Sequence, residues 1–181
     1  VWDATITTTD QWPLEDEPHA IARMLEALDR TLALYPDGFF RQMKNTMGEG
    51  GVRFMPVGHI ENAVNAIGLT YETYGWQNIY IDVTIDAFDG TICHEIWHAI
   101  EGVLLTRNWD AINQEEWAAC NPAGFSYNED AETPDSNPER WTFFYEFSAQ
   151  DVYFVDAYSR TNAKEDRARI MEYIMATEDV A

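Results

Sequence analysis

One stretch near the middle of the chain, residues 91–106, restricts the possible folds more than any other. Apolar residues recur along it at helical spacing: Ile92, Ile96, Ile100, Val103, Leu104 and Leu105. This pattern predicts a helix that is largely buried. His94 and His98 lie within it four residues apart, so both imidazoles project from the same face of the helix. The fold must therefore place a partner for two histidines beside a buried helix.

The two histidines have two possible roles. In the simpler one, backbone carbonyls satisfy both imidazoles and the helix is only structural. In the other, both imidazoles bind one metal ion, and zinc readily accepts imidazole nitrogen. Glu95 completes the pattern His-Glu-x-x-His, in which the glutamate acts as the general base on a metal-activated water. We favour the metal site, because the pattern lies within a predicted helix and a chain with four histidines rarely contains it by chance.

A catalytic zinc site needs a third protein ligand and an open position for water. A third histidine six residues after the second is excluded, because Leu104 occupies that position. The remaining common arrangement takes a glutamate from a later helix. The candidates are Glu101, Glu115, Glu116, Glu146, Glu165 and Glu172. Glu101 shares the histidine face but lies one turn further along, which suits a residue that supports a ligand better than a ligand.

Glu165 stands out among these glutamates because it begins a predicted helix seven residues after Tyr158. A tyrosine hydroxyl beside the site can stabilise the oxyanion that forms during peptide hydrolysis. Both residues also have structural explanations. Asn162 and Glu165 fit a helix start in which the glutamate satisfies backbone N–H groups, and Tyr158 can belong to the core. Spacing alone leaves both alternatives open.

Weaker patterns predict the other elements of one domain that spans residues 1–181. They are an extended arm over residues 1–16, a helix from about 17 to 35, strands at 52–57, 69–74 and 78–85, a short helix at 111–120, and a helix that Asn162 caps and that ends near Met175. The strand at 78–85 is the most regular, and its free edge is expected to pair with an extended peptide. Asp89, Gly90 and Thr91 are expected to begin the histidine helix.

Charge limits the possible partners. The net charge is −21, from 32 acidic and 11 basic residues, so nucleic acids and anionic membrane surfaces are unsuitable partners. No apolar run approaches the roughly 20 residues of a membrane span. We therefore expect no membrane span and no nucleic-acid partner. We also expect the protein to be a monomer that acts on a peptide or protein substrate.

Two features are left open by the sequence. Cys93 and Cys120 are too few for a disulfide scaffold, although they can form one bridge. The acidic segment 128–139 lacks the spacing of a known calcium loop and is more typical of a solvated surface loop. Neither the bridge nor a calcium ion is decided by these patterns.

Several segments together resemble a family of bacterial zinc-binding metallopeptidases. The segments are Tyr35–Phe40, His94–Glu101, Trp117 with Asn121–Tyr127, and Phe154–Ser159 followed by Lys164–Asp166. That family is similar in its site to the anthrax lethal factor catalytic domain and to the Pro-Pro endopeptidases. The resemblance begins near residue 35 and does not include the first 30 residues.

In that group two histidines and a later glutamate bind zinc, the motif glutamate is the base, and a tyrosine seven residues before the ligand glutamate assists the oxyanion. Carried over, the zinc ligands are His94, His98 and Glu165, the base is Glu95, and the assisting tyrosine is Tyr158. Two positions depart from the pattern. Trp97 stands where a glycine is usual, and Arg169 stands where a second acid is frequent. Both departures are expected to alter the cleft rather than remove a ligand.

The resemblance and the residue patterns together predict a secreted or cell-surface bacterial zinc endopeptidase of the gluzincin type. The fold is expected to be α+β and zincin-like, with a small sheet packed on the metal-binding helix and a helical C-terminal part. Glu101 and Asp166 are expected to support the ligands. The alternatives are a metal-containing cell-surface binding module without turnover, and a purely structural domain without metal.

Overall fold

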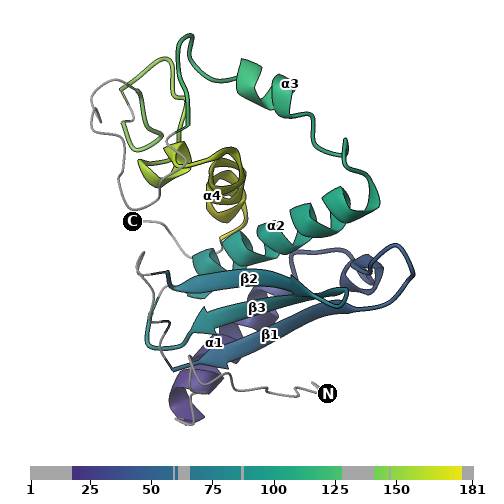
Figure 1. Cartoon of the computed structure of the whole chain (residues 1–181). Coiled ribbons are helices and arrows are strands. Elements are labelled where there is room, and N and C mark those ends of the chain that lie inside the picture. Colours follow the sequence, from purple (N-terminus) through teal and green to yellow (C-terminus); the bar gives the residue numbers. More distant parts are fainter. Residues whose placement is uncertain are drawn as a thin grey trace.

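The histidine helix lies between a small sheet and a C-terminal helix (Figure 1). The computed structural model describes residues 18–58, 60, 66–86, 88–127, 141–146 and 148–176. Its elements are α1 (Pro18–Leu32), η1 (Phe40–Gln42), β1 (Gly51–Val57), β2 (Gly68–Thr73), β3 (Trp76–Asp82), α2 (Phe88–Arg107), α3 (Gln114–Ala119), η3 (Tyr158–Arg160) and α4 (Ala163–Met175). The predicted α+β class is therefore confirmed, and the predicted helices and strands lie within a few residues of the observed ones.

The sheet has the strand order β1-β3-β2. Strand β1 runs parallel to β3, whereas β2 runs antiparallel to it. Tyr74 and Gly75 join β2 to β3 in a tight turn with positive φ angles of 51° and 81°, the conformation that suits a two-residue hairpin. The prediction of a free edge on the strand at 78–85 is wrong, because β3 is paired on both sides. Among the described strands, the edge nearest the histidine helix belongs to β2.

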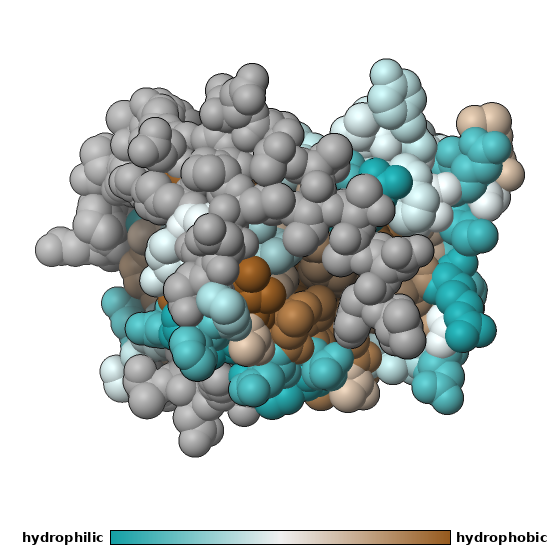
Figure 2. Space-filling model, turned by 90° about the horizontal axis from the view of Figure 1, so that it is seen from below, coloured by the Kyte–Doolittle hydropathy of each residue, from teal (hydrophilic) through white to brown (hydrophobic). Residues whose placement is uncertain are grey.

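Apolar side chains of three elements form the core. Ile92 and Ile96 of α2 pack with Ile79 and Ile81 of β3 and with Leu28 of α1. All five are at most 1% exposed, which explains why the apolar pattern of the histidine helix is so dense. Figure 2 views the molecule from the side away from α4, where apolar residues gather within a hydrophilic rim. The core therefore fixes α2 on the sheet and leaves its opposite side for contact with α4.

Helix α2 begins at Phe88, before the predicted cap. Asp89 lies inside its first turn, where its carboxylate pairs with Arg30 of α1, and Arg30 Nη2 lies 2.9 Å from Asp89 Oδ1. A negative charge in the first turn of a helix is favourable. Asp89 therefore ties α1 to the start of α2 instead of capping the helix.

Helix α4 begins as predicted. The side chain of Asn162 accepts hydrogen bonds from the N–H groups of Lys164 and Glu165, each at 3.0 Å. An ion pair then joins α4 to α2: Arg167 Nη2 and Nε lie 2.7 and 3.0 Å from the two carboxylate oxygens of Glu101. Both side chains are at least 96% buried. The cap and the ion pair fix the rotation of α4 against α2.

The remaining predictions concern the N-terminal arm, the acidic segment, the two cysteines and a membrane span. The arm at 1–16 and the acidic segment 128–139 lie outside the described residues. Cys93 is buried and Cys120 is exposed, and both are free thiols, so the structure contains no bridge between them. None of the described helices has the length and apolarity needed to cross a bilayer.

Candidate metal centre

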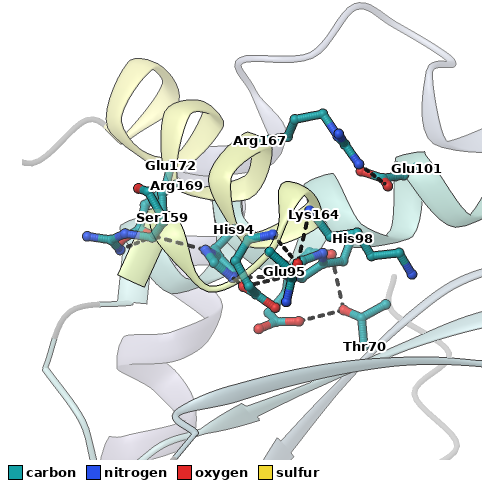
Figure 3. Close-up of polar contacts among 12 residues, drawn as sticks. Thr70, His94, Glu95, His98, Glu101, Ser159, Lys164, Arg167, Arg169 and Glu172 are labelled. Atoms are coloured by element: carbon teal, nitrogen blue, oxygen red, sulfur yellow. Dashed lines mark hydrogen bonds and ion pairs between the residues drawn. The ribbon is translucent and has the colours of Figure 1, made fainter. Parts of the chain in front are cut away.

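Three predicted ligands converge between α2 and α4. His94 and His98 point from α2 towards the first turn of α4 (Figure 3), where Glu165 lies. Glu165 Oε2 is 3.0 Å from His94 Nε2 and 3.3 Å from His98 Nε2. The two Nε2 atoms lie 3.1 Å apart. The structure therefore resolves the alternatives for Glu165: Asn162 caps the helix, and the carboxylate of Glu165 faces the imidazoles.

These separations suit a divalent metal ion. A tetrahedral zinc ion with bonds of about 2.0–2.1 Å holds its ligand atoms about 3.3 Å apart, close to the three distances in this cluster. Two imidazoles and one carboxylate are also a donor set of catalytic zinc sites. Two nitrogen atoms that face each other at 3.1 Å need either a shared proton or a cation between them. The described residues thus fit zinc in both chemistry and size.

Glu172 orients the first ligand. Its Oε2 lies 3.1 Å from His94 Nδ1, so the Nδ1–H group donates to the carboxylate and the lone pair of Nε2 faces the centre. Gly90 of α2 makes this approach possible, because a Cβ atom there would lie 2.9 Å from Glu172 Oε1. From the sequence alone, Glu172 is only one of the candidate third ligands. Its seven-residue spacing from Glu165, two helical turns, was the signal that both carboxylates share one face of α4.

The cluster carries a proton when no metal is bound. Burial alone would lower the pKa of His94, but the hydrogen-bonded carboxylates of Glu165 and Glu172 outweigh it and raise this pKa to about 9. Burial would conversely raise the pKa of Glu165, yet the imidazoles of His94 and His98 hold it well below its ordinary value. A metal ion that binds these groups must therefore displace a proton.

Glu95 lies beside the cluster in a fitted recess. It is 5% exposed, and the hydroxyl of Thr70 donates a hydrogen bond of 2.7 Å to Glu95 Oε2. Gly68 of β2 provides the space, since a Cβ atom there would lie 2.7 Å from Glu95 Oε1. Burial raises the pKa of Glu95 above its ordinary value. A carboxylate with a raised pKa accepts a proton more readily, as a general base requires.

Tyr158 lines the same cleft as Glu95, at the start of η3. Its ring centroid is 6.3 Å from that of His94, and its side chain remains partly accessible. Burial and the nearby carboxylate of Glu165 both raise the pKa of Tyr158. The hydroxyl is therefore protonated at neutral pH and can donate a hydrogen bond into the site.

A cleft of about 480 Å³ opens onto these residues. Residues of β2, among them Gly68, Thr70 and Tyr71, line one side. The opposite side includes Tyr158 and Lys164. The cleft therefore runs between β2, an edge strand among the described strands, and the start of α4, with the histidine helix between them.

The structure places the two predicted supporting residues in other contacts. Glu101 lines the cleft, but its carboxylate pairs with Arg167. Asp166 accepts hydrogen bonds from Tyr127 at 2.8 Å and Trp117 at 3.2 Å, and burial raises its pKa to about 6. These contacts hold α4 to α2, to α3 and to the segment after α3. Glu172, rather than Glu101 or Asp166, contacts the predicted ligand His94.

The other candidate third ligands lie apart from the histidines. Glu115 and Glu116 are exposed in the first turn of α3, and Glu146 is also exposed. Within the described residues, the one group of histidine, cysteine and acidic side chains with metal-binding geometry is His94, His98 and Glu165.

Comparisons with protein-family models, curated proteins and solved structures find no match for this chain. The resemblance to bacterial zinc metallopeptidases therefore stays a prediction. The described residues establish an α+β protein with a candidate metal centre in a cleft, and any functional assignment depends on the chemistry of that centre.

Proposed function

We propose that the protein is a zinc-dependent endopeptidase of the gluzincin type with a zincin-like fold. The observation that carries this proposal is the convergence of His94, His98 and Glu165 from two helices, beside the buried carboxylate of Glu95. A structural role for the histidines would require only hydrogen-bond partners. It would not account for two imidazoles and a carboxylate at the spacing of zinc ligands, or for a buried acid next to them.

Each residue of the centre has a role in peptide hydrolysis. A zinc ion held by His94, His98 and Glu165 would supply a Lewis acid that lowers the pKa of water and polarises the scissile carbonyl. Glu95 takes the proton of the attacking water and then donates it to the leaving amine. Tyr158 donates a hydrogen bond to the oxygen that gains negative charge.

The surrounding surface suits an extended peptide. Strand β2 pairs with β3 on one side only, among the strands that the structure describes. Its residues Leu69, Thr70 and Tyr71 line the cleft. A substrate strand can add to such an edge through main-chain hydrogen bonds, which places a peptide bond over the centre.

The test compares the wild type with Glu95→Gln on a peptide library. Glutamine retains the hydrogen bond from Thr70 but cannot take up a proton, so we expect cleavage to fall by roughly 10²- to 10⁴-fold. Zinc content, measured by elemental analysis, should stay at one ion per chain in both proteins. Removal of zinc by a chelator should abolish cleavage, and added zinc should restore it.

Two results would contradict the proposal. A protein that holds no stoichiometric zinc, even after zinc is added, would favour the structural domain. Zinc without cleavage in both the wild type and Glu95→Gln would favour the alternative, a metal-containing binding module without turnover.

A further inference from the structure

Arg169 connects two carboxylates that lie behind the candidate metal centre. Its Nη2 atom lies 2.6 Å from Asp156 Oδ2, and its Nη1 atom contacts Glu172 Oε2. The three side chains are between 21% and 26% exposed. One guanidinium therefore joins a residue that precedes η3 to a residue two turns into α4.

One of these contacts leads to the metal ligands. Glu172 Oε2 is the same oxygen that lies 3.1 Å from His94 Nδ1. Arg169 neutralises the charge of this carboxylate and limits its rotation, because the planar guanidinium fixes the direction of its N–H groups. The ring plane of His94 is set by its bond to Glu172. The orientation of His94 Nε2 therefore depends on Arg169, although the two residues do not need to touch.

The other contact leads to Tyr158. Asp156 uses its second oxygen, Oδ1, to accept hydrogen bonds from the backbone N–H and the hydroxyl of Ser159, at 3.0 and 3.2 Å. Ser159 follows Tyr158 directly and is fully buried. Figure 3 places Ser159, Arg169 and Glu172 together on the side of His94 away from Thr70. The turn that carries Tyr158 is therefore held from behind by the same guanidinium.

We propose that Arg169 is a positioning residue that aligns a zinc ligand and the oxyanion donor at once, through Glu172 for His94 and through Asp156 for Tyr158. This inference rests on the proposed function for the part that concerns Tyr158. The part that concerns His94 requires only that the centre binds zinc. Arginine suits the position because its two terminal nitrogens reach two separate carboxylates, whereas lysine offers a single nitrogen.

The test measures zinc affinity, by competition with a chromogenic chelator, and the kcat of peptide cleavage at saturating zinc. We expect Arg169→Met to weaken zinc binding by up to about 10- to 100-fold, the range that follows loss of a group bonded directly to a metal-bound histidine. It should also lower kcat when zinc is saturating. Arg169→Lys should restore part of the zinc affinity, because it pairs with one carboxylate at a time. Arg53→Met, which changes the same charge on β1, should leave both quantities unchanged.

A second measurement separates positioning from general loss of structure. In a Tyr158→Phe background, Arg169→Met should lower kcat much less than it does in the wild type, since the hydroxyl that it aligns is absent. Glu172→Gln covers the case in which Arg169→Met does not fold. It keeps an acceptor for His94 but loses the charge that Arg169 pairs with, and it should weaken zinc binding less than Glu172→Ala.

The possible failures can be distinguished. Unchanged zinc affinity in Arg169→Met, or equal kcat losses with and without the hydroxyl of Tyr158, would overturn the positioning role and leave the proposed function intact. If the wild type binds zinc but cleaves no peptide, the proposed function fails. The zinc affinities of the wild type and Arg169→Met then still decide whether Arg169 positions His94. A wild type that binds no zinc overturns both.

Discussion

The contact between α2 and α4 has two parts that contain similar groups and differ in chemistry. In the first part, Arg167 meets both oxygens of Glu101, and both side chains are almost fully buried. One positive charge there matches one negative charge. This buried ion pair joins the two helices, and neither charge is left without a partner.

The second part, around His98 and His94, lies one to two turns closer to the start of α2 and brings several acceptor groups together. Glu165 and Glu172 both face His94, and His98 adds a second imidazole. Arg169 pairs with Glu172, and the charge of Glu165 is balanced only by the proton that a raised pKa of about 9 keeps on His94. The difference teaches that a candidate metal site can be recognised by a set of groups whose charges balance only through a displaceable proton, whereas a directly paired Glu101 and Arg167 indicate structure.

The largest effect is expected from removing an acceptor in the second part. Glu165→Ala takes away the third ligand, so stoichiometric zinc and peptide cleavage should both be lost. The matched control is Glu146→Ala, because Glu146 begins the same Glu-x-x-Ala pattern but is exposed. Elemental analysis and a peptide-cleavage assay report the two effects. Full zinc occupancy in Glu165→Ala would remove Glu165 from the ligand set.

The next largest effect concerns the first part. Glu101→Ala leaves the guanidinium of Arg167 buried without its partner, which should lower the free energy of unfolding by about 3–5 kcal/mol. Zinc affinity of the folded protein should not change. Urea denaturation of the zinc-free protein measures the first quantity, and Glu115→Ala on the exposed face of α3 is the control. A loss of zinc affinity without a loss of stability would instead support the earlier prediction that Glu101 supports the ligands.

The comparison also explains which features were predictable from the sequence. His94 and His98 share a helix face, and Asn162 caps α4, because these relations depend on residues three or four apart. The strands were found from local alternation. The identity of the edge strand was not, since pairing joins β3 to both β1 and β2 across the chain, and local patterns do not encode the order.

The arrangement of the supporting groups was hidden for a similar reason. Whether Glu101 or Glu172 reaches a histidine depends on how α4 is rotated and on where it crosses α2. A sequence shows that Glu165 and Glu172 share a face, but it does not show that Arg167 lies opposite Glu101. Arg169 was noticed only as a departure from a family pattern, and its two partners come from different elements.

A smaller effect is expected from adding a single methyl group beside Glu172, in the second part of the contact between α2 and α4. Gly90→Ala places a Cβ atom 2.9 Å from Glu172 Oε1, so Glu172 must shift and His94 loses its support. We expect zinc binding to weaken by up to about 10- to 100-fold. Gly102→Ala is the matched control on the same helix, because its Cβ atom would meet Gln77 at 3.1 Å instead. Both changes favour the helix by up to about 1 kcal/mol, so only the loss of zinc affinity in Gly90→Ala distinguishes them.

The smallest effect is a change in the sign of the pH dependence of stability. In the metal-free protein the pKa of His94 is raised from 6.5 to about 9. A raised pKa in the folded state means that protonated His94 stabilises the fold fully below pH 6.5 and that this contribution is lost as the pH rises through about 9. Asp166, whose pKa is raised from 3.8 to about 6, also stabilises the fold while it is protonated. Its contribution is lost over a more acidic range, as the pH rises through about 6.

With zinc bound, protons compete with the metal for the same nitrogens, so stability should instead fall as the pH drops below about 6.5. Melting temperatures measured from pH 5 to pH 10, with chelator and with zinc, should therefore slope in opposite directions. In chelator, His94→Gln should remove the slope between pH 6.5 and pH 9 and retain the acidic one. Parallel curves with and without zinc would mean that His94 is not a ligand, because a proton and a metal ion at the same nitrogen exclude each other.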